Sequence, residues 1–176
     1  MFFVKKLSEK PWIVFLGALG LGVVLHFLYG WLPSPLSALV SPVRESLWEH
    51  MKLLFVPLLP AALLLTRGAP ALRAARLLAI PTVCLLMLGI AWLYHVPLRG
   101  DALLFDLLLY AAMMVLGFLL PRWLWPLTRE WSGLSPAAAA LLLLGGLMVW
   151  FTFSPPEGVL FADLGGGVQT FLRLPV

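Results

Sequence analysis

Long apolar stretches alternate along the chain with short polar connections. A helix needs about 20 apolar residues to cross a hydrocarbon core of about 30 Å. About five stretches reach this length, and the helices that they predict cover about 12–31, 46–66, 77–94, 102–120 and 136–153. The pattern therefore predicts an all-α fold, a polytopic transmembrane bundle of about five helices.

The end of the chain breaks this pattern. Residues 154–176 are too polar, and too often interrupted by proline and glycine, to form a simple further span. We therefore divide the chain into a transmembrane bundle, residues 1–153, and an extracytoplasmic tail, residues 154–176. Two alternatives remain open for the tail, which either folds back over the bundle as a cap or is a flexible extension.

The composition supports a membrane protein and excludes a soluble domain. Hydrophobic residues make up 62% of the 176 residues and charged residues only 11%, far from the mixture typical of soluble domains. Although the net charge is +4, the Lys and Arg residues lie in short connections rather than on one basic face. We expect membrane lipids as partners and no nucleic acid. Cys84 is the only cysteine, which excludes an intrachain disulfide.

The distribution of Lys and Arg predicts the orientation of the bundle. Most of these residues precede the first helix or lie in the connections on the same side of the membrane as the N-terminus. Because cytoplasmic loops are enriched in Lys and Arg, we expect the N-terminus inside and the C-terminus outside. No A-x-A-like cleavage site follows the first apolar stretch, so we interpret it as an uncleaved helix.

Histidine, lysine and acidic residues within the predicted spans, or at their ends, gather on the outer side. They are His26, Glu49, His50, Lys52, His95 and Asp106. At a rise of 1.5 Å per residue, His26 lies about 7 Å below the outer end of its helix. Since charged and imidazole side chains are costly inside a membrane, this layer predicts an outward-facing functional site in the outer leaflet.

The start of the second predicted helix carries the densest group of polar residues. Ser41, Pro42 and an acid in the first turn are typical of a helix N-terminus. On such a helix Glu45 and Glu49 share a face because they are four residues apart, and Lys52 follows three residues later. Two interpretations remain open: a Glu49–Lys52 pair that reaches the interface, or an inward-facing acid–imidazole cluster.

His26 has a positional argument of its own. Ala18, Gly22 and His26 are spaced by four residues, and small residues at this spacing allow another helix to approach closely. We therefore expect His26 to point into the bundle. The alternative is a histidine that is hydrogen-bonded to a neighbouring helix for structural reasons alone.

Two short motifs resemble elements of a known family. The segment RESLWEHMK, residues 44–52, resembles the Asn-Glu-Ser-x-Trp-Glu-His-x-Lys signature of a family of small uncharacterised bacterial membrane proteins, with Arg44 in place of the Asn. The tail segment LFAD, residues 160–163, is similar to a second element. The resemblance implies a multi-pass protein of the bacterial cytoplasmic (inner) membrane. It supports the choice of site residues, but the family has no assigned activity.

The first functional hypothesis is a metal-dependent enzyme that acts on a lipid or lipid-linked substrate. His26, His50 and His95 would be metal ligands, with zinc as a suitable ion. Glu49, His50 and Asp106 would be catalytic. Ligand-binding roles are predicted for Arg44, Glu45, Lys52 and Asp163. In a metal-free variant, Lys52 or Arg44 would hold a phosphate headgroup.

Two other classes of function use the same residues. The protein could be an outward-facing binder, or a subunit of a transport assembly, for a metal, haem or a small ligand entering from the outer side. In the third hypothesis the polar residues only hold the helices together. That structural hypothesis predicts that Glu49, Lys52 and His26 are mutually satisfied and leave no cavity.

Overall fold

The computed structural model describes residues 10–131 and 135–164, and within these ranges it contains helices and connections but no strand. Five segments are long and apolar enough to cross a membrane. They are Pro11–Trp31, Leu47–Thr66, Pro70–His95, Leu103–Thr128 and Pro136–Phe153. The predicted all-α bundle of five spanning helices is thus confirmed.

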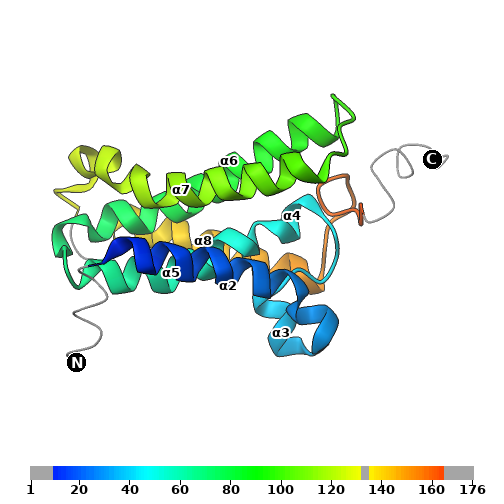
Figure 1. Cartoon of the computed structure of the whole chain (residues 1–176), viewed down its shortest axis with the longest axis horizontal. Helices are drawn as coiled ribbons and strands as arrows, with labels where there is room; N and C mark the ends of the chain where they lie inside the picture. The colour runs from blue at the N-terminus through cyan, green and yellow to red at the C-terminus, as the bar shows by residue number, and fades with distance from the viewer. Residues whose placement is uncertain (1–9, 132–134, 165–176) are drawn as a thin grey trace.

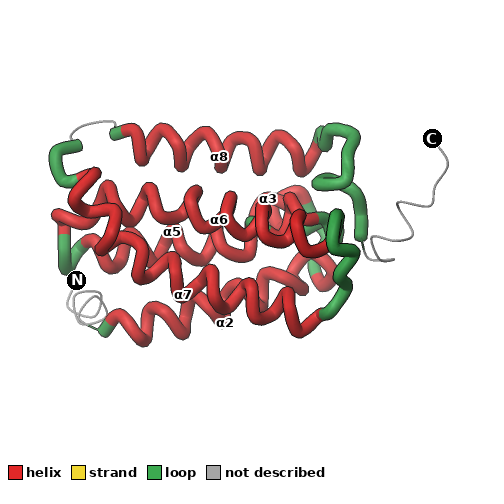
Figure 2. The backbone as a smooth tube through the Cα atoms, turned by 90° about the horizontal axis from the view of Figure 1, so that it is seen from above, coloured by secondary structure: helices red, strands yellow, loops and turns green. Residues whose placement is uncertain are grey.

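The long helices lie side by side along one axis (Figure 1). They are α2 (Pro11–Trp31), α5 (Lys52–Thr66), α6 (Arg73–His95), α7 (Leu103–Thr128) and α8 (Pro136–Phe153). Helix α6 packs against α5, α7 and α8, whereas α2 packs mainly against α5. Figure 2 shows α8 on one side of the α5–α6 pair and α2 and α7 on the other. The core between them is apolar and includes the fully buried Leu54, Cys84 and Met114.

Two spans are longer than the hydrophobic pattern predicts. Helix α6 begins at Arg73 after a short 3-10 helix, η1 (Pro70–Leu72), and α7 continues past Pro121 and Arg122 to Thr128. A charged residue ends the apolar pattern but does not end the helix, because a long basic side chain can reach the interface from a helical backbone. Proline within a membrane helix is also tolerated.

The second span, Leu47–Thr66, agrees with the predicted range of 46–66, but its helix does not begin at the start signal formed by Ser41 and Pro42. Ser46 is the N-cap of α4 (Leu47–His50), and its hydroxyl accepts a hydrogen bond from the Glu49 amide at 3.2 Å. Helix α4 continues into α5 through Met51. Because Glu45 precedes the helix, it does not share a helical face with Glu49, and that part of the prediction is wrong.

Ser41 instead ends a short helix, α3 (Pro35–Val40), that the hydrophobic pattern did not predict. Ser34 and Ser37 form a capping box at its start, with Pro35 in the first turn. These are recognised helix-start signals. The hydrophobic pattern does not reveal this helix because 6 residues are too few to show a helical period.

The described part of the tail folds back over the start of α4. The Trp48 amide donates to the Leu160 carbonyl at 3.0 Å, and the Leu164 amide donates to the Glu45 carbonyl at 2.9 Å. The Trp48 ring also packs against the rings of Phe151 and Phe161. Up to Leu164 the tail is therefore a cap, and the rest of the tail, residues 165–176, lies outside the described residues.

Gly22 is the point at which α2 approaches its neighbours most closely. A Cβ atom at this position would lie 2.7 Å from the Leu53 carbonyl oxygen and would overlap the Tyr110 hydroxyl. That hydroxyl donates a hydrogen bond to the Leu19 carbonyl at 2.9 Å. The absence of a side chain at Gly22 thus lets α2, α5 and α7 meet just below His26.

Replacing Gly22 by alanine is expected to lower the free energy of unfolding by about 1–3 kcal/mol, because overpacking must push the backbones apart. Gly17 and Gly20 on the same helix have no atom within 4 Å of the Cβ position, so the same substitution there serves as a matched control. Unfolding in detergent with increasing SDS measures all three variants. Equal stability of the Gly22 and Gly20 variants would contradict the close approach.

Candidate functional site

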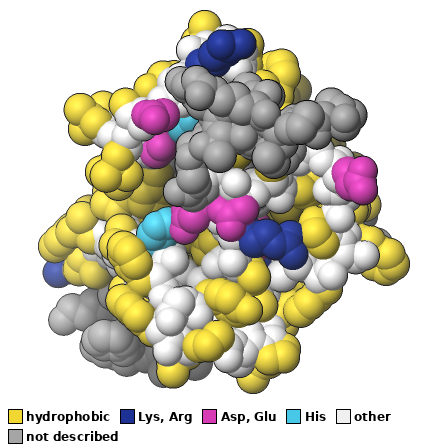
Figure 3. Space-filling view, turned by 90° about the vertical axis from the view of Figure 1, so that its right-hand side faces the viewer, with side chains coloured by type: hydrophobic (Ala, Val, Ile, Leu, Met, Phe, Trp, Pro, Cys, Tyr) yellow, Lys and Arg dark blue, Asp and Glu magenta, His cyan; other side chains and the backbone are white. Residues whose placement is uncertain are grey.

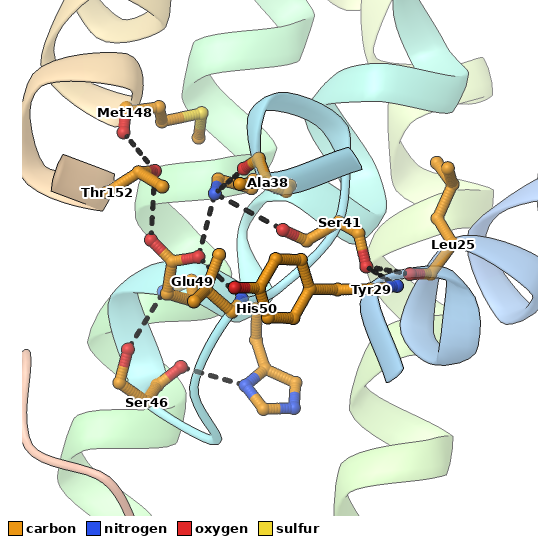
Figure 4. Close-up of polar contacts among 11 residues, drawn as sticks. Leu25, Tyr29, Ala38, Ser41, Ser46, Glu49, His50, Met148 and Thr152 are labelled. Atoms are coloured by element: carbon orange, nitrogen blue, oxygen red, sulfur yellow. Dashed lines mark hydrogen bonds and ion pairs between the residues drawn. The ribbon is translucent and has the colours of Figure 1, made fainter. Parts of the chain in front are cut away.

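Glu49, which is labelled in Figure 4, forms a buried ion pair with Lys52 at the start of the second span. Their side chains are 3% and 1% exposed, and Lys52 Nζ lies 2.7 Å from Glu49 Oε2. The ammonium also donates to the carbonyls of Ala38 at 2.7 Å and Ser41 at 3.3 Å. These contacts use all three donors of the lysine. Lys52 therefore has no donor left for a phosphate headgroup, contrary to the role predicted for it.

Glu49 connects the same pair to the rest of the bundle. Its Oε2 accepts a hydrogen bond from the Val43 amide at 3.0 Å, and its Oε1 accepts one from the Thr152 hydroxyl on α8 at 3.1 Å. Glu49 and Lys52 thus hold together α3, the connection before α4, and α8. This arrangement matches the structural hypothesis for these two residues and does not match the predicted surface pair.

The acid–imidazole cluster contains Glu45 rather than Glu49. One ligand atom from each of His26, Glu45 and His50 lies within 4.8 Å of the other two. His50 Nε2 is 3.3 Å from Glu45 Oε2, and the rings of His26 and His50 are 5.5 Å apart between centroids. The three side chains come from α2, from the connection before α4, and from α4 itself.

A hydrogen bond to one ring nitrogen of His50 fixes the orientation of its imidazole ring. Nδ1 lies 2.8 Å from the Ser46 carbonyl oxygen, which can only accept, so Nδ1 carries a proton. Nε2 is consequently the atom that faces Glu45. A metal-bound histidine commonly donates its other ring N–H to a backbone carbonyl in this way. The hydrogen bond from His50 is also the main reason why the pKa of Glu45 is lowered.

His26 contributes a buried polar atom to this cluster. Its Nδ1 is buried and has no hydrogen-bond partner among the described residues. A buried polar atom without a partner is uncommon and costs free energy. The structural hypothesis expected His26 to be satisfied by a neighbouring helix, and its Nδ1 is not satisfied by any described residue.

A second imidazole–carboxylate pair joins α6 and α7. His95 Nδ1 lies 2.9 Å from the Gly100 carbonyl oxygen, and His95 Nε2 lies 2.8 Å from Asp106 Oδ1. Because the carbonyl must accept, Nδ1 carries a proton, and Nε2 is the atom directed at the carboxylate. The pair thus links α6 to the first turns of α7.

Both imidazole–carboxylate pairs line one cavity of about 510 Å³. The polar and aromatic-hydroxyl side chains around it are His26, Glu45, His50, His95, Asp101, Asp106 and Tyr110. No Lys or Arg belongs to the described residues that line it. Acidic and histidine side chains gather near the middle of the corresponding end face of the molecule (Figure 3). A volume of this size is typical of ligand pockets.

The structure separates the predicted site residues into groups. It brings His26, Glu45 and His50 together and places His95 and Asp106 on the same cavity. Glu49 and Lys52 do not line it. Arg44 is half-buried beside Glu45, and Asp163 is exposed in the tail.

Tyr110 is not among the predicted site residues, although its spacing from Asp106 indicates that it belongs to the site. It lies four residues after Asp106 and therefore shares a helical face with it. Tyr110 lines the same cavity, and its hydroxyl donates to the Leu19 carbonyl. The spacing would have identified Tyr110 if it had been applied to α7 as it was to α2.

Comparisons with known proteins assign the chain to a family but indicate no activity for it. No curated protein and no solved structure matches the chain. The model of a family of unknown function, DUF6512, matches residues 3–169. Because this match covers almost the whole chain, the protein belongs to this family of unknown function.

Proposed function

We propose that this protein is a zinc-dependent hydrolytic enzyme of the membrane that acts on a lipid or lipid-linked substrate. The observation that carries the proposal is the convergence of His26, Glu45 and His50 on a cavity that they share with the His95–Asp106 pair. The first group supplies metal ligands, and the second supplies a proton acceptor. Together they form the parts of a hydrolytic site.

The three ligand side chains suit zinc. Catalytic zinc sites commonly use three protein ligands, including sets of two histidines and one glutamate, and leave a fourth position open. Ligand atoms about 2.0–2.2 Å from a tetrahedral ion lie about 3.4 Å from one another. The distance from His50 Nε2 to Glu45 Oε2 is already 3.3 Å. Rotation of the His26 ring, whose Nδ1 has no partner among the described residues, would complete the set.

The reaction that fits these groups is hydrolysis of an acyl linkage. Zinc in this position would polarise the acyl oxygen and lower the pKa of water. The Asp106 carboxylate, through the oxygen that does not contact His95, takes a proton from a water molecule as the water oxygen adds to the acyl carbon. The bond between that carbon and the leaving oxygen then breaks, and Asp106 returns the proton to the leaving oxygen. The products are a carboxylic acid and an alcohol.

We place the site in the outer leaflet of the cytoplasmic membrane of a bacterium. The distribution of Lys and Arg over the connections supports an N-terminus inside and a C-terminus outside. With this orientation the His26 end of α2 and the tail lie toward the outer surface. The resemblance of residues 44–52 to a signature of bacterial membrane proteins supports the same localisation.

Elemental analysis of the purified protein tests the metal site. After loading with zinc and removal of the excess, we expect about one zinc ion per chain from a three-ligand site. The His26→Ala and His50→Ala variants should lose it. His95→Ala is the matched control, since it removes a histidine from the same cavity but not from the ligand group. Absence of zinc in the unsubstituted protein, or equal loss in all three variants, would refute the site.

A further inference from the structure

The cavity has an opening on its side, between α2 and α7. Two lining residues on each of these helices are well exposed: Val23 is 50% and Phe27 49% exposed on α2, and Leu103 is 70% and Leu107 55% exposed on α7. Its lining residues on α5 and α6 are buried, as Leu53 and Met87 show. The cavity therefore has its floor on α5 and α6 and its mouth between α2 and α7.

This mouth lies at the depth of hydrocarbon chains. Val23 precedes the end of α2 at Trp31 by eight residues, or about 12 Å of helix at 1.5 Å per residue. Both flanking helices are membrane spans, and all the residues of the mouth are apolar. At this depth the molecules beside the mouth are the lipids of the surrounding bilayer, with their chains toward it.

The charge at the polar end of the cavity restricts which lipid fits. Glu45, Asp101 and Asp106 line it, whereas no Lys or Arg does so among the described residues. Anions are recognised in proteins chiefly by Arg and Lys, so an anionic headgroup would meet three carboxylates with no Lys or Arg beside it among the described residues. A neutral acyl linkage carries no such penalty, because its carbonyl needs only a hydrogen-bond donor or a metal ion.

We propose that a neutral acyl lipid of the bilayer enters the cavity sideways between α2 and α7. Its hydrocarbon chain lies against Val23, Phe27 and Leu107, and its acyl carbonyl reaches the group formed by His26, Glu45 and His50. This proposal rests on the proposed hydrolytic function and specifies its substrate class as an acyl lipid without a charged headgroup.

Photochemical labelling tests this binding site directly. The probes are a diacylglycerol and a phosphatidic acid with the same diazirine-bearing chain, each in vesicles of phosphatidylcholine. After illumination, mass spectrometry measures the label on the floor of the cavity, around Leu53 and Met87. We expect floor labelling by the diacylglycerol to exceed labelling by the phosphatidic acid.

Variants that narrow the mouth provide the decisive comparison. Val23→Trp and Leu107→Trp, made separately, are each expected to reduce floor labelling about tenfold, the change given by about 1.4 kcal/mol of lost binding. Leu143→Trp is the matched control, because Leu143 is 66% exposed on α8 and does not line the cavity. The helix content and the size-exclusion profile in detergent, measured in parallel, should be unchanged in all three variants and so show that they are folded.

The outcomes separate this proposal from the proposed function. Undiminished floor labelling in both mouth variants, or stronger labelling by phosphatidic acid, would overturn the sideways path of a neutral lipid. If the labelling follows the expected pattern but the protein binds no zinc, the lipid site is supported. Only the proposed zinc-dependent hydrolysis is then contradicted.

Discussion

Replacing Lys52 by methionine is expected to lower the free energy of unfolding by about 3–5 kcal/mol, the cost of leaving a buried charge without its partner. The Glu49 carboxylate is 3% exposed and would keep only the hydrogen bonds from Val43 and Thr152. The carbonyls of Ala38 and Ser41 would also lose their donor. Loss of the contacts made by the Lys52 ammonium should therefore disturb the whole connection from α3 to α4.

The double variant Glu49→Met/Lys52→Met distinguishes a lost charge partner from simple loss of packing. Removing both charges leaves no isolated ion, so the double variant should be more stable than the single Lys52→Met variant. Titration with SDS in detergent micelles measures each free energy of unfolding. Glu130→Gln is the control, because the Glu130 side chain is 84% exposed and exposed ion pairs contribute little. A single variant as stable as this control would contradict the network.

Replacing Asp106 by asparagine is expected to slow hydrolysis by about 10²–10⁴-fold, the usual contribution of a general base. The amide keeps the shape of the side chain beside His95 Nε2, which lies 2.8 Å from Asp106 Oδ1, but cannot take a proton from water. Zinc should be retained, because Asp106 does not belong to the group of His26, Glu45 and His50. The variant thus separates proton transfer from metal binding.

Hydrolysis of a medium-chain 4-nitrophenyl ester in mixed micelles measures this effect as kcat at a fixed pH. Glu157→Gln replaces an exposed carboxylate in the tail outside the cavity and should leave the rate unchanged. A rate within a factor of about two of the unsubstituted protein, far below the contribution of a base, would refute this role for Asp106.

The sequence is sufficient to predict the bundle because membranes constrain helices strongly. A hydrocarbon core of fixed thickness requires apolar stretches of about 20 residues whose backbone hydrogen bonds are satisfied within the helix. The prediction for the last span, 136–153, accordingly agrees with Pro136–Phe153 in the structure. The small residue Gly22, four positions before His26, also correctly indicated the face of α2 that approaches other helices.

The connections are less predictable because their paths depend on contacts between distant residues. The hydrogen bond from Thr152 to Glu49 spans 103 positions in the sequence. It helps to hold Glu49 in the buried network, and Glu45 in the neighbouring connection contacts His50 instead. Spacing along one assumed helix could not distinguish the two acids, since it placed both on the same face.

The sequence by itself thus determined that the protein is a bundle of membrane helices, and it identified the polar residues from which a site could be built. Only the tertiary structure decided that Lys52 and Glu49 hold the fold together, whereas His26, Glu45 and His50 face a cavity. The physical reason is that helix formation in a membrane depends on local apolar length. The partner of a buried charge depends instead on which segments the folded chain brings within hydrogen-bonding distance.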